Sequence, residues 1–502
     1  MLYIKKPLIC AHVIKISAIM KISDKFEPEK VWKYFGEICK VPRPSKKEGK
    51  IIDWLTQFAA EQGLEMKKDT AGNILISKPA TKGFENRQAT VLQSHMDMVC
   101  EKNSDIDHDF ENDPIVPFVE GDWVRAKGTT LGADDGIGMA AQLALLASDD
   151  IEHGKIECLF TVDEETGLTG AFALEPGFFD GNILINLDSE DEGELFIGCA
   201  GGVDTLAAME YDNEEIPSSH YGFIVKIGGL AGGHSGDDIH KGRGNSVKIL
   251  NRFIWNLNNR YDMKLASFNG GNLRNAIPRE AEAVFSIHRD DVPAMKEYFG
   301  SYREIILSEL TGADNGFRMS LDETSLPGNA VDEDTQLDLL YSLYACPHGV
   351  IAWSPKIEGL VETSTNLASV KFNDNRITIT TSQRSSSDSA KADVAAMVES
   401  VFRLANANVK KTGGYPGWSP NRDSQVLYLT ETAYKRLFGK DPIVRAIHAG
   451  LECGLFLEKY PGLDMISFGP TIKGAHSPDE RLHIESVSRF WDLLLEVLRT
   501  TP

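Results

Sequence analysis

Short apolar segments that alternate with helical segments constrain the fold of this chain most strongly. Apolar runs of this length predict buried strands, and periodic runs of ten residues or more predict helices. Strands are expected at 73–77, 89–99, 156–162 and 183–188, and helices at 28–39, 47–62, 136–147 and 485–499. Strands that alternate with helices favour an α/β fold in which helices cover both faces of the sheet.

The domain organisation follows from length and from a change in patterning. A chain of 502 residues is too long for one ordinary hydrophobic core, so more than one domain is expected. Between residues 206 and 418 a strand-helix-strand-strand-helix order occurs twice. We therefore expect an N-terminal extension at 1–20 and a first domain in two parts, 21–205 and 419–502. An α+β domain of two βαββαβ-like modules at 206–418 interrupts the first domain.

Charge and cysteine content narrow the function classes. The formal net charge of −22 argues against nucleic acid and against anionic membranes as partners. The seven cysteines are scattered and form no C-x-x-C pair, which excludes a disulfide scaffold and favours a cytoplasmic protein. The first 20 residues imitate a signal peptide, but His12 and Lys15 interrupt the apolar region, so we expect a disordered extension.

Histidine and acidic residues stand inside or just after the expected strands. His95 and Asp97 interrupt the apolar run Val91–Cys100, and residues two apart on a strand share one face. The alternative interpretation is a core histidine with a nearby capping or surface aspartate. Similar groups occur in the segments Gly132-Ala-Asp-Asp-Gly-Ile-Gly138, Thr161-Val-Asp-Glu-Glu-Thr-Gly167, Ile185-Asn-Leu-Asp-Ser-Glu190 and Gly474-Ala-His-Ser-Pro-Asp-Glu480.

Each of these segments also has an ordinary explanation. A helix cap accounts for one of the two aspartates at Asp134-Asp135 but not for both, and a solvated loop or turn accounts for the others. Their common position changes the interpretation, because ligands of open α/β sheets bind outside the carboxyl ends of the strands. Two imidazoles with several carboxylates suit zinc. A metal pair about 3.5–4 Å apart can activate water and polarise a carbonyl together, and the adjacent pair Glu164-Glu165 offers a ligand beside a base.

The ordered series of these five segments resembles the aminoacyl-histidine dipeptidases, a branch of the co-catalytic zinc exopeptidases. The resemblance covers nearly the whole chain from about Lys21. It implies a zinc-exopeptidase-like catalytic domain with a central mixed sheet and a lid formed by the inserted domain. It also implies two Zn²⁺ ions, which Co²⁺ or Mn²⁺ could replace, and a cis peptide between Asp134 and Asp135.

The same resemblance assigns site residues. Asp134 would bridge the two ions, with His95 and Asp188 completing one, and Glu165 and His476 the other. Glu164 would act as general base, and Asp97 would orient His95. In the lid, His234 would stabilise the oxyanion, Asn275 would hold the substrate backbone, and Arg384 would bind its terminal carboxylate. Alone, His234 could be an incidental histidine in a glycine-rich turn, and Arg384 an ordinary strand arginine.

The leading functional hypothesis is a metallo-dipeptidase that hydrolyses unblocked dipeptides, Xaa-His included. Two alternatives stay open: an N-acyl amino-acid amidohydrolase on the same scaffold, and a peptide-binding protein without activity. The first shares all of the catalytic motifs, because both enzymes cleave an amide next to a free carboxylate. The second has no use for a base beside the metals. The sequence leaves the side-chain preference, the physiological metal and a homodimeric state undecided.

Overall fold

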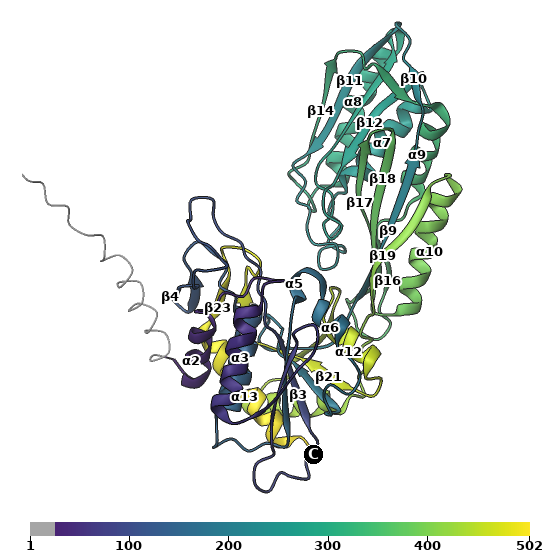
Figure 1. Ribbon diagram of the computed structural model, residues 1–502. Coiled ribbons are helices and arrows are strands. Elements are labelled where there is room, and N and C mark those ends of the chain that lie inside the picture. Colours follow the sequence, from purple (N-terminus) through teal and green to yellow (C-terminus); the bar gives the residue numbers. More distant parts are fainter. Residues whose placement is uncertain (1–25) are drawn as a thin grey trace, which may run out of the picture. The chain divides into compact units, whose positions relative to one another are not determined.

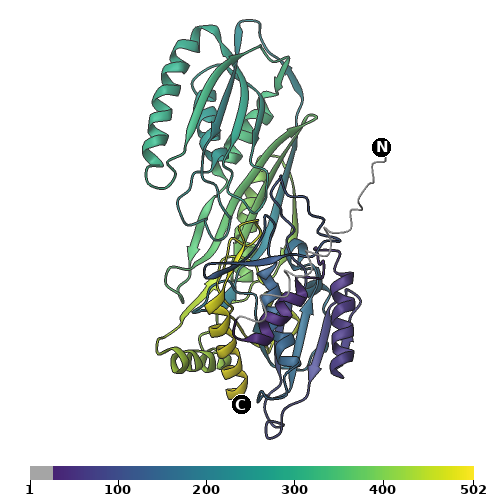
Figure 2. The ribbon, with the colours of Figure 1, turned by 90° about the vertical axis from the view of Figure 1, so that its left-hand side faces the viewer.

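The computed structural model describes residues 26–502 and divides into two compact units. Unit 1 contains the described residues up to Ile197 together with Asn421–Arg445 and Leu455–Pro502, and unit 2 contains Gly198–Pro420 and Ala446–Gly454. Figures 1 and 2 show the two units in two views. The expected extension at 1–20 lies outside the described residues, and the expected domain boundaries stay a prediction.

Unit 1 is built on an eight-stranded mixed sheet. The strand order is β1 (Glu65–Lys68), β2 (Ile74–Lys78), β6 (Ile156–Thr161), β3 (Thr90–His95), β7 (Ile183–Asn186), β21 (Asp464–Ser467), β8 (Glu194–Cys199) and β20 (Ile443–Ile447). Strands β6, β3, β7 and β21 run parallel to one another, so their carboxyl ends share one edge of the sheet.

The four expected strands of the first half are all present, and their residues are buried along the whole length of β3, β6 and β7. Burial of every residue means that both faces of the sheet are covered, as the continuous apolar runs predict. Strand β3 is shorter than expected, because it ends at His95 and not at Val99. Asp97 therefore lies two residues past the end of the strand.

From residue 26 onwards, eight helices belong mainly to unit 1. They are α2 (Glu29–Ile38), α3 (Gly49–Gln62), α4 (Ala133–Leu146), α5 (Glu164–Gly167), α6 (Thr169–Ala173), α11 (Gln425–Phe438), α12 (Cys453–Lys459) and α13 (Ile484–Thr500). Helix α4 is buried along nearly its whole length and packs between α2 and β3. Among the described residues, no helix combines the length and the apolar character that crossing a membrane requires.

A small antiparallel sheet in unit 1 carries the segment of His476. Its strands are β22 (Ile472–Lys473), β23 (Arg481–His483), β5 (Trp123–Ala126) and β4 (Pro117–Glu120), in that order. His476 lies in the loop between β22 and β23, where its φ of 63° is left-handed. The loop follows β21, so the C-terminal part of the chain brings this histidine to the carboxyl edge of the main sheet.

Unit 2 is an antiparallel sheet with helices. The order is β14 (Arg318–Thr324), β11 (His220–Gly228), β13 (Ala281–His288), β12 (Met263–Gly270), β17 (Val361–Asn373), β18 (Arg376–Ser385), β9 (Gly201–Glu210) and β19 (Asn408–Tyr415), with β16 (Gly349–Trp353) paired to β17. A separate pair joins β10 (Asn213–Glu215) to β15 (Asn329–Val331), and the 3₁₀ helix η1 spans Arg289–Asp291. The remaining helices are α7 (Ser246–Asn258), α8 (Val292–Glu309), α9 (Glu333–Ala345) and α10 (Asp388–Leu404).

One hydrophobic core joins the two halves of unit 2. Helix α7 packs on strands β11, β12, β13 and β17, and α10 packs on β9, β17, β18 and β19. Buried and more exposed residues alternate along β11, as expected for a strand with one face on the core. Segment Ala446–Gly454 also belongs to unit 2, although both of its flanks belong to unit 1.

Candidate metal centre

The five residues that the sequence predicts as metal ligands lie together in unit 1. His95 is the last residue of β3, Glu165 is in α5 just after β6, and Asp188 follows β7 by two residues. Asp134 is the second residue of α4, and His476 comes from the loop after β22. The parallel strands place His95, Glu165 and Asp188 at one edge of the main sheet. The loop of the small antiparallel sheet carries His476.

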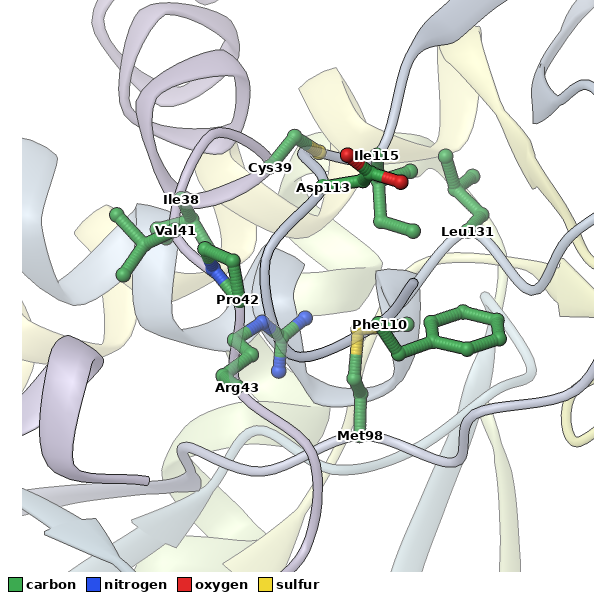
Figure 3. A pocket seen from close by; sticks show the side chains of 10 residues that line it. All are labelled: Ile38, Cys39, Val41, Pro42, Arg43, Met98, Phe110, Asp113, Ile115 and Leu131. Atoms are coloured by element: carbon green, nitrogen blue, oxygen red, sulfur yellow. The ribbon is translucent and has the colours of Figure 1, made fainter. Parts of the chain in front are cut away.

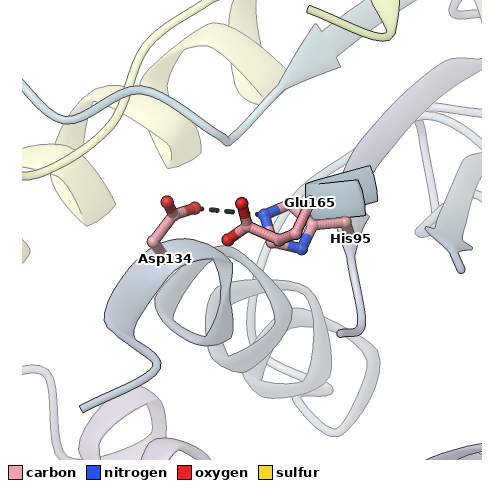
Figure 4. A group of neighbouring side chains, drawn as sticks. All are labelled: His95, Asp134 and Glu165. Atoms are coloured by element: carbon pink, nitrogen blue, oxygen red, sulfur yellow. Dashed lines mark hydrogen bonds and ion pairs between the residues drawn. The ribbon is translucent and has the colours of Figure 1, made fainter. Parts of the chain in front are cut away.

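Asp134 lies between the two imidazoles. Its Oδ1 is 3.0 Å from Nε2 of His95, and its Oδ2 is 3.2 Å from Nε2 of His476. The ligand atoms of His95, Asp134 and Glu165 all lie within 4.8 Å of one another (Figure 4). One carboxylate thus presents a separate oxygen to each histidine.

A second carboxylate accompanies each imidazole. Nε2 of His95 lies 3.6 Å from Oδ1 of Asp188, and Nε2 of His476 lies 3.0 Å from Oε2 of Glu165. The residues therefore form two histidine–carboxylate pairs that share Asp134. The pairs are the same as those in the expected ligand sets for two ions.

Asp97 connects the end of β3 to the start of α5. Its Oδ1 is 3.3 Å from Nδ1 of His95 and accepts a hydrogen bond from the backbone N–H of Glu164 at 3.0 Å. Its Oδ2 accepts one from the backbone N–H of Glu165 at 3.3 Å and one from Ser45 Oγ at 2.8 Å. This one buried carboxylate fixes the position of both adjacent glutamates and faces the histidine.

The two adjacent aspartates have different structural roles, which explains why a helix cap accounts for only one of them. Asp135 Oδ1 accepts a hydrogen bond from the backbone N–H of Gly138 in the first turn of α4, at 3.1 Å. A Cβ atom on Gly138 would lie 2.3 Å from that oxygen, so this position requires glycine. Asp134 instead faces the histidines, and the peptide bond between the two aspartates is cis, as the resemblance implies.

The gathered carboxylates create a strongly negative site. Burial lowers the pKa of His95, but the charge of Asp188 and hydrogen bonds with Asp134, Asp188 and Asp97 raise it well above its ordinary value. Hydrogen bonds with Asp134 and Glu165 raise the pKa of His476 to about 11. Burial, partly offset by His95, raises the pKa of Asp188 to about 7. The site thus favours positive charge next to its carboxylates.

These residues fit divalent metal ions. Imidazole nitrogen and carboxylate oxygen are the ligands that zinc takes in sites open to substrate. Oε1 of Glu165 is buried and has no hydrogen-bond partner among the described residues, so it is available for coordination. A buried carboxylate oxygen without a partner is unfavourable unless an ion or another group occupies that place.

Two buried residues, Glu480 and Arg43, support the turn that carries Asp134. Glu480 accepts backbone hydrogen bonds from Leu131 at 2.7 Å, Gly132 at 2.9 Å, Ala133 at 2.7 Å and Asp134 at 3.3 Å. Because Glu480 lies four residues after His476, it ties the histidine loop to this turn.

Arg43 supports the same turn from the other side. Its guanidinium donates to the backbone carbonyls of Met96, Asp97 and Gly132, and so joins the end of β3 to the start of α4. Arg43 also lines a small cavity with Met98 and Leu131 (Figure 3). The sequence shows only that two prolines flank Arg43 and that Glu480 lies in the His476 segment, and neither feature indicates these contacts.

Glu190 is a further acidic residue, at the end of the segment Ile185–Glu190 that also carries Asp188. Burial and the negative charges of Asp134 and Asp188 raise its pKa to about 8. Its backbone carbonyl accepts a hydrogen bond from the N–H of Ile472 at 3.0 Å.

Unit 2 brings together the residues expected in the lid. Nε2 of His234 lies 3.4 Å from a guanidinium nitrogen of Arg384, and Nδ1 of His234 lies 3.2 Å from Asp237. Asn275 is exposed, and its backbone carbonyl accepts a hydrogen bond from Ser235 at 2.8 Å. Arg384 is buried, contacts the hydroxyl of Tyr415 at 3.2 Å, and has no carboxylate within ion-pair distance among the described residues. Its Nε has no hydrogen-bond partner there.

Tyr415 and His448 also belong to this cluster, and the sequence does not indicate either of them. His448 lies in the segment 446–454, and its Nε2 is 2.7 Å from Ser364 Oγ. Burial and the charge of Arg384 lower the pKa of His448 to about 3, so this imidazole is neutral at pH 7. A histidine followed by a glycine two residues later is too common a pattern to indicate this position.

A mixed α/β sheet with two histidines and three carboxylates at its strand ends is the arrangement of a metal-dependent hydrolase. The sequence model of peptidase family M20/M25/M40 matches residues 91–500. The chain belongs to this family.

Two proteins with similar sequences cover almost all of the chain. The cytosol non-specific dipeptidase of Escherichia coli is 45% identical over 95% of this chain and 99% of its own length. The crystal structure of aminoacylhistidine dipeptidase from Vibrio alginolyticus is 44% identical, with a TM-score of 0.88, and covers 97% of this chain and 99% of that one. The predicted resemblance and fold class are confirmed.

A third similarity concerns the fold alone. The aminopeptidase PepT of Bacillus cereus is 17% identical, with a TM-score of 0.55, and covers 94% of this chain and 98% of that one.

Proposed function

We propose that this protein is a dinuclear zinc dipeptidase that hydrolyses unblocked dipeptides, with Xaa-His dipeptides among its substrates. The observation that supports this most directly is the position of Asp134, with one oxygen 3.0 Å from His95 and the other 3.2 Å from His476. A structural ion pair needs only one such contact, whereas a bridging ligand must offer an oxygen to each of two ions.

The five gathered residues would hold the metal ions. His95 and Asp188 would bind one ion, Glu165 and His476 the other, and Asp134 both. Zinc is the first choice because of the mixed nitrogen and oxygen ligands, and Co²⁺ or Mn²⁺ could replace it. When bound, such ions lower the pKa of water and polarise the scissile carbonyl.

Glu164 is the general base of the proposal. It stands next to Glu165, and Asp97 accepts a hydrogen bond from its backbone N–H, so the main chain that carries this carboxylate is anchored beside a ligand. It takes the proton of the attacking water and then gives it to the leaving amine.

The remaining site residues orient a metal ligand or bind the substrate. Asp97 holds His95 by its Nδ1 side, which leaves Nε2 for the metal. By the resemblance, His234 would stabilise the oxyanion, Asn275 would hold the substrate backbone, and Arg384 would bind the terminal carboxylate. A buried guanidinium without an acidic partner, as found for Arg384 in unit 2, suits the binding of a carboxylate.

The names of two similar proteins support the substrate class and the location. The relatives from E. coli and V. alginolyticus are a non-specific dipeptidase and an aminoacylhistidine dipeptidase. The name of the E. coli protein also places it in the cytosol, and we infer a cytoplasmic location for this chain.

A substrate comparison tests the proposal. Zinc-loaded protein should cleave free dipeptides such as Ala-His and leave N-acetyl amino acids intact. The opposite preference would favour the amidohydrolase alternative. Failure to cleave either class would favour a binding protein.

A further inference from the structure

We propose that the hydroxyl group of Tyr415 binds the terminal carboxylate of the dipeptide together with Arg384, and so makes the site selective for substrates with a free carboxylate next to the scissile bond. Tyr415 would complete a subsite of the proposed dipeptidase, on whose function this inference rests. Both residues belong to unit 2, and the resemblance assigns no role to Tyr415.

A β-bulge brings Tyr415 to Arg384. Residues 408–412 of β19 pair in register with β9, and the register shifts by one residue before Tyr415 pairs with Gly202. One extra residue turns the following side chain to the opposite face of a strand. On the other side of β9, Gly202 pairs with Arg384 of β18. The two side chains therefore flank the same glycine, and Nη1 of Arg384 donates a hydrogen bond to the Tyr415 hydroxyl at 3.2 Å.

Two glycines leave room for the hydroxyl end of the Tyr415 ring. A Cβ atom at Gly202 would lie 2.6 Å from Cε1 of the ring and 2.8 Å from the hydroxyl oxygen. A Cβ atom at Gly450 would lie 3.0 Å from Cε2 and 3.1 Å from the same oxygen. The backbone carbonyl of Tyr415 also accepts a hydrogen bond from Nζ of Lys391. The local structure thus fixes both the main chain and the position of the hydroxyl group.

The Tyr415 hydroxyl has a proton to donate. A guanidinium can only donate hydrogen bonds, so the oxygen of Tyr415 is the acceptor in its contact with Arg384. The O–H of Tyr415 finds no acceptor among residues 26–502. Burial, partly offset by the charge of Arg384, raises the pKa of Tyr415, so the hydroxyl keeps its proton at pH 7.

Arg384 gives this free donor an anion to share. The residue is 7% exposed, and its Nε has no hydrogen-bond partner in the described part of the chain. Nη1 contacts Tyr415 and Nη2 lies 3.4 Å from Nε2 of His234, so the guanidinium stands between the two side chains. A dipeptide carries its terminal carboxylate one residue from the scissile carbonyl, which suits an anion subsite next to the proposed oxyanion group. A carboxylate there can accept from both the guanidinium and the hydroxyl.

The test compares two substrates that differ only in the carboxylate: Ala-His and Ala-histamine, which lacks it. The full-length zinc-loaded protein is compared with Tyr415→Phe, which keeps the ring. The control is Tyr302→Phe, which removes another buried tyrosine hydroxyl of unit 2 from its partner, the carbonyl of Ile249. In Tyr415→Phe, kcat/KM for Ala-His should fall roughly 10- to 150-fold, mainly through KM, because one hydrogen bond to a charged group is lost. The rate for Ala-histamine should stay within about twofold, and Tyr302→Phe should leave the ratio of the two rates unchanged.

An Arg384→Ala background distinguishes direct binding from mere support of the guanidinium. In that background, Tyr415→Phe should still lower kcat/KM for Ala-His by roughly threefold or more, because the hydroxyl contacts the carboxylate itself. A residue that only positions Arg384 would cause no further loss there.

Equilibrium binding provides a readout that does not depend on turnover. In a Glu164→Ala background, Tyr415→Phe should weaken the Kd of Ala-His by a factor similar to that found for kcat/KM, and leave the Kd of Ala-histamine and the bound zinc unchanged. An equal loss for both ligands, no loss for either, or no further loss in the Arg384→Ala background would overturn the inference and leave the dipeptidase proposal intact. If zinc-loaded wild-type protein hydrolyses no dipeptide, the proposed function itself is wrong.

Discussion

Nδ1 of His95 lies 3.3 Å from Oδ1 of Asp97, and both side chains are buried. The pair forms just past the end of β3, where the chain leaves the sheet. Asp97 also accepts hydrogen bonds from Ser45 and from the backbone of Glu164 and Glu165. Its charge is thus shared between one candidate ligand and the segment that carries two other functional residues.

Replacing Asp97 with asparagine should weaken zinc binding by about 10- to 100-fold, because the imidazole of His95 loses the group that orients it and raises its basicity. A competition titration with a chelator measures the change. Ser45→Ala removes only one hydrogen bond to Asp97 and should have a smaller effect. Unchanged zinc affinity in Asp97→Asn would show that the contact has no bearing on the metal.

Substitutions of the adjacent glutamates Glu164 and Glu165 should affect catalysis and metal binding separately. Glu164→Gln should lower kcat by about 10²- to 10⁴-fold, because the proton acceptor is lost, and it should retain bound zinc and substrate affinity. Glu165→Gln should lose zinc, since a candidate ligand is removed. Metal analysis and steady-state kinetics on both variants test the assignment. Normal turnover in Glu164→Gln would exclude it as the base.

Glu480 should be needed for the turn that positions Asp134. In Glu480→Gln, an NH₂ group faces backbone N–H donors that now have a carboxylate oxygen. We expect a loss of about 1–3 kcal/mol in the free energy of unfolding, measured by denaturant titration, together with weaker zinc binding. The neighbouring Asp479→Asn changes an exposed residue and should leave both properties unchanged. A Glu480→Gln protein with wild-type stability would contradict this role.

Zinc affinity should rise with pH. Surrounding carboxylates raise the pKa of His476 to about 11 and that of His95 well above its ordinary value. The imidazole of His476 is therefore protonated at pH 7 in the metal-free protein, and zinc must displace its proton. Each proton released strengthens binding about tenfold per pH unit over this range. Calorimetry at pH 6, 7 and 8, in buffers of different ionisation enthalpy, counts the protons, and an affinity independent of pH would contradict the expectation.

Much of the fold and the candidate centre could be predicted because buried parallel strands appear in the sequence as short apolar runs. Apolar runs that end in His95, in Glu164-Glu165 and in Asp188 indicate buried strands whose carboxyl ends share one edge of a sheet. His476 could be included only through the resemblance, since its loop reaches the edge from the far end of the chain. The predicted length of β3 was wrong, because buried apolar residues continue past its last ladder partner.

The supporting residues could not be predicted because their partners are main-chain groups far away in sequence. Arg43 donates to carbonyls 53 to 89 residues away, and Glu480 accepts from amides nearly 350 residues away.

The central claim is that two metal ions bound by these five residues carry the activity. The most direct measurement is the metal content of the purified protein, with hydrolysis of Ala-His followed through chelation and the return of zinc. We predict two zinc ions per chain, loss of hydrolysis when they are removed, and recovery in proportion to the zinc restored. Full activity in protein freed of metal would contradict the claim.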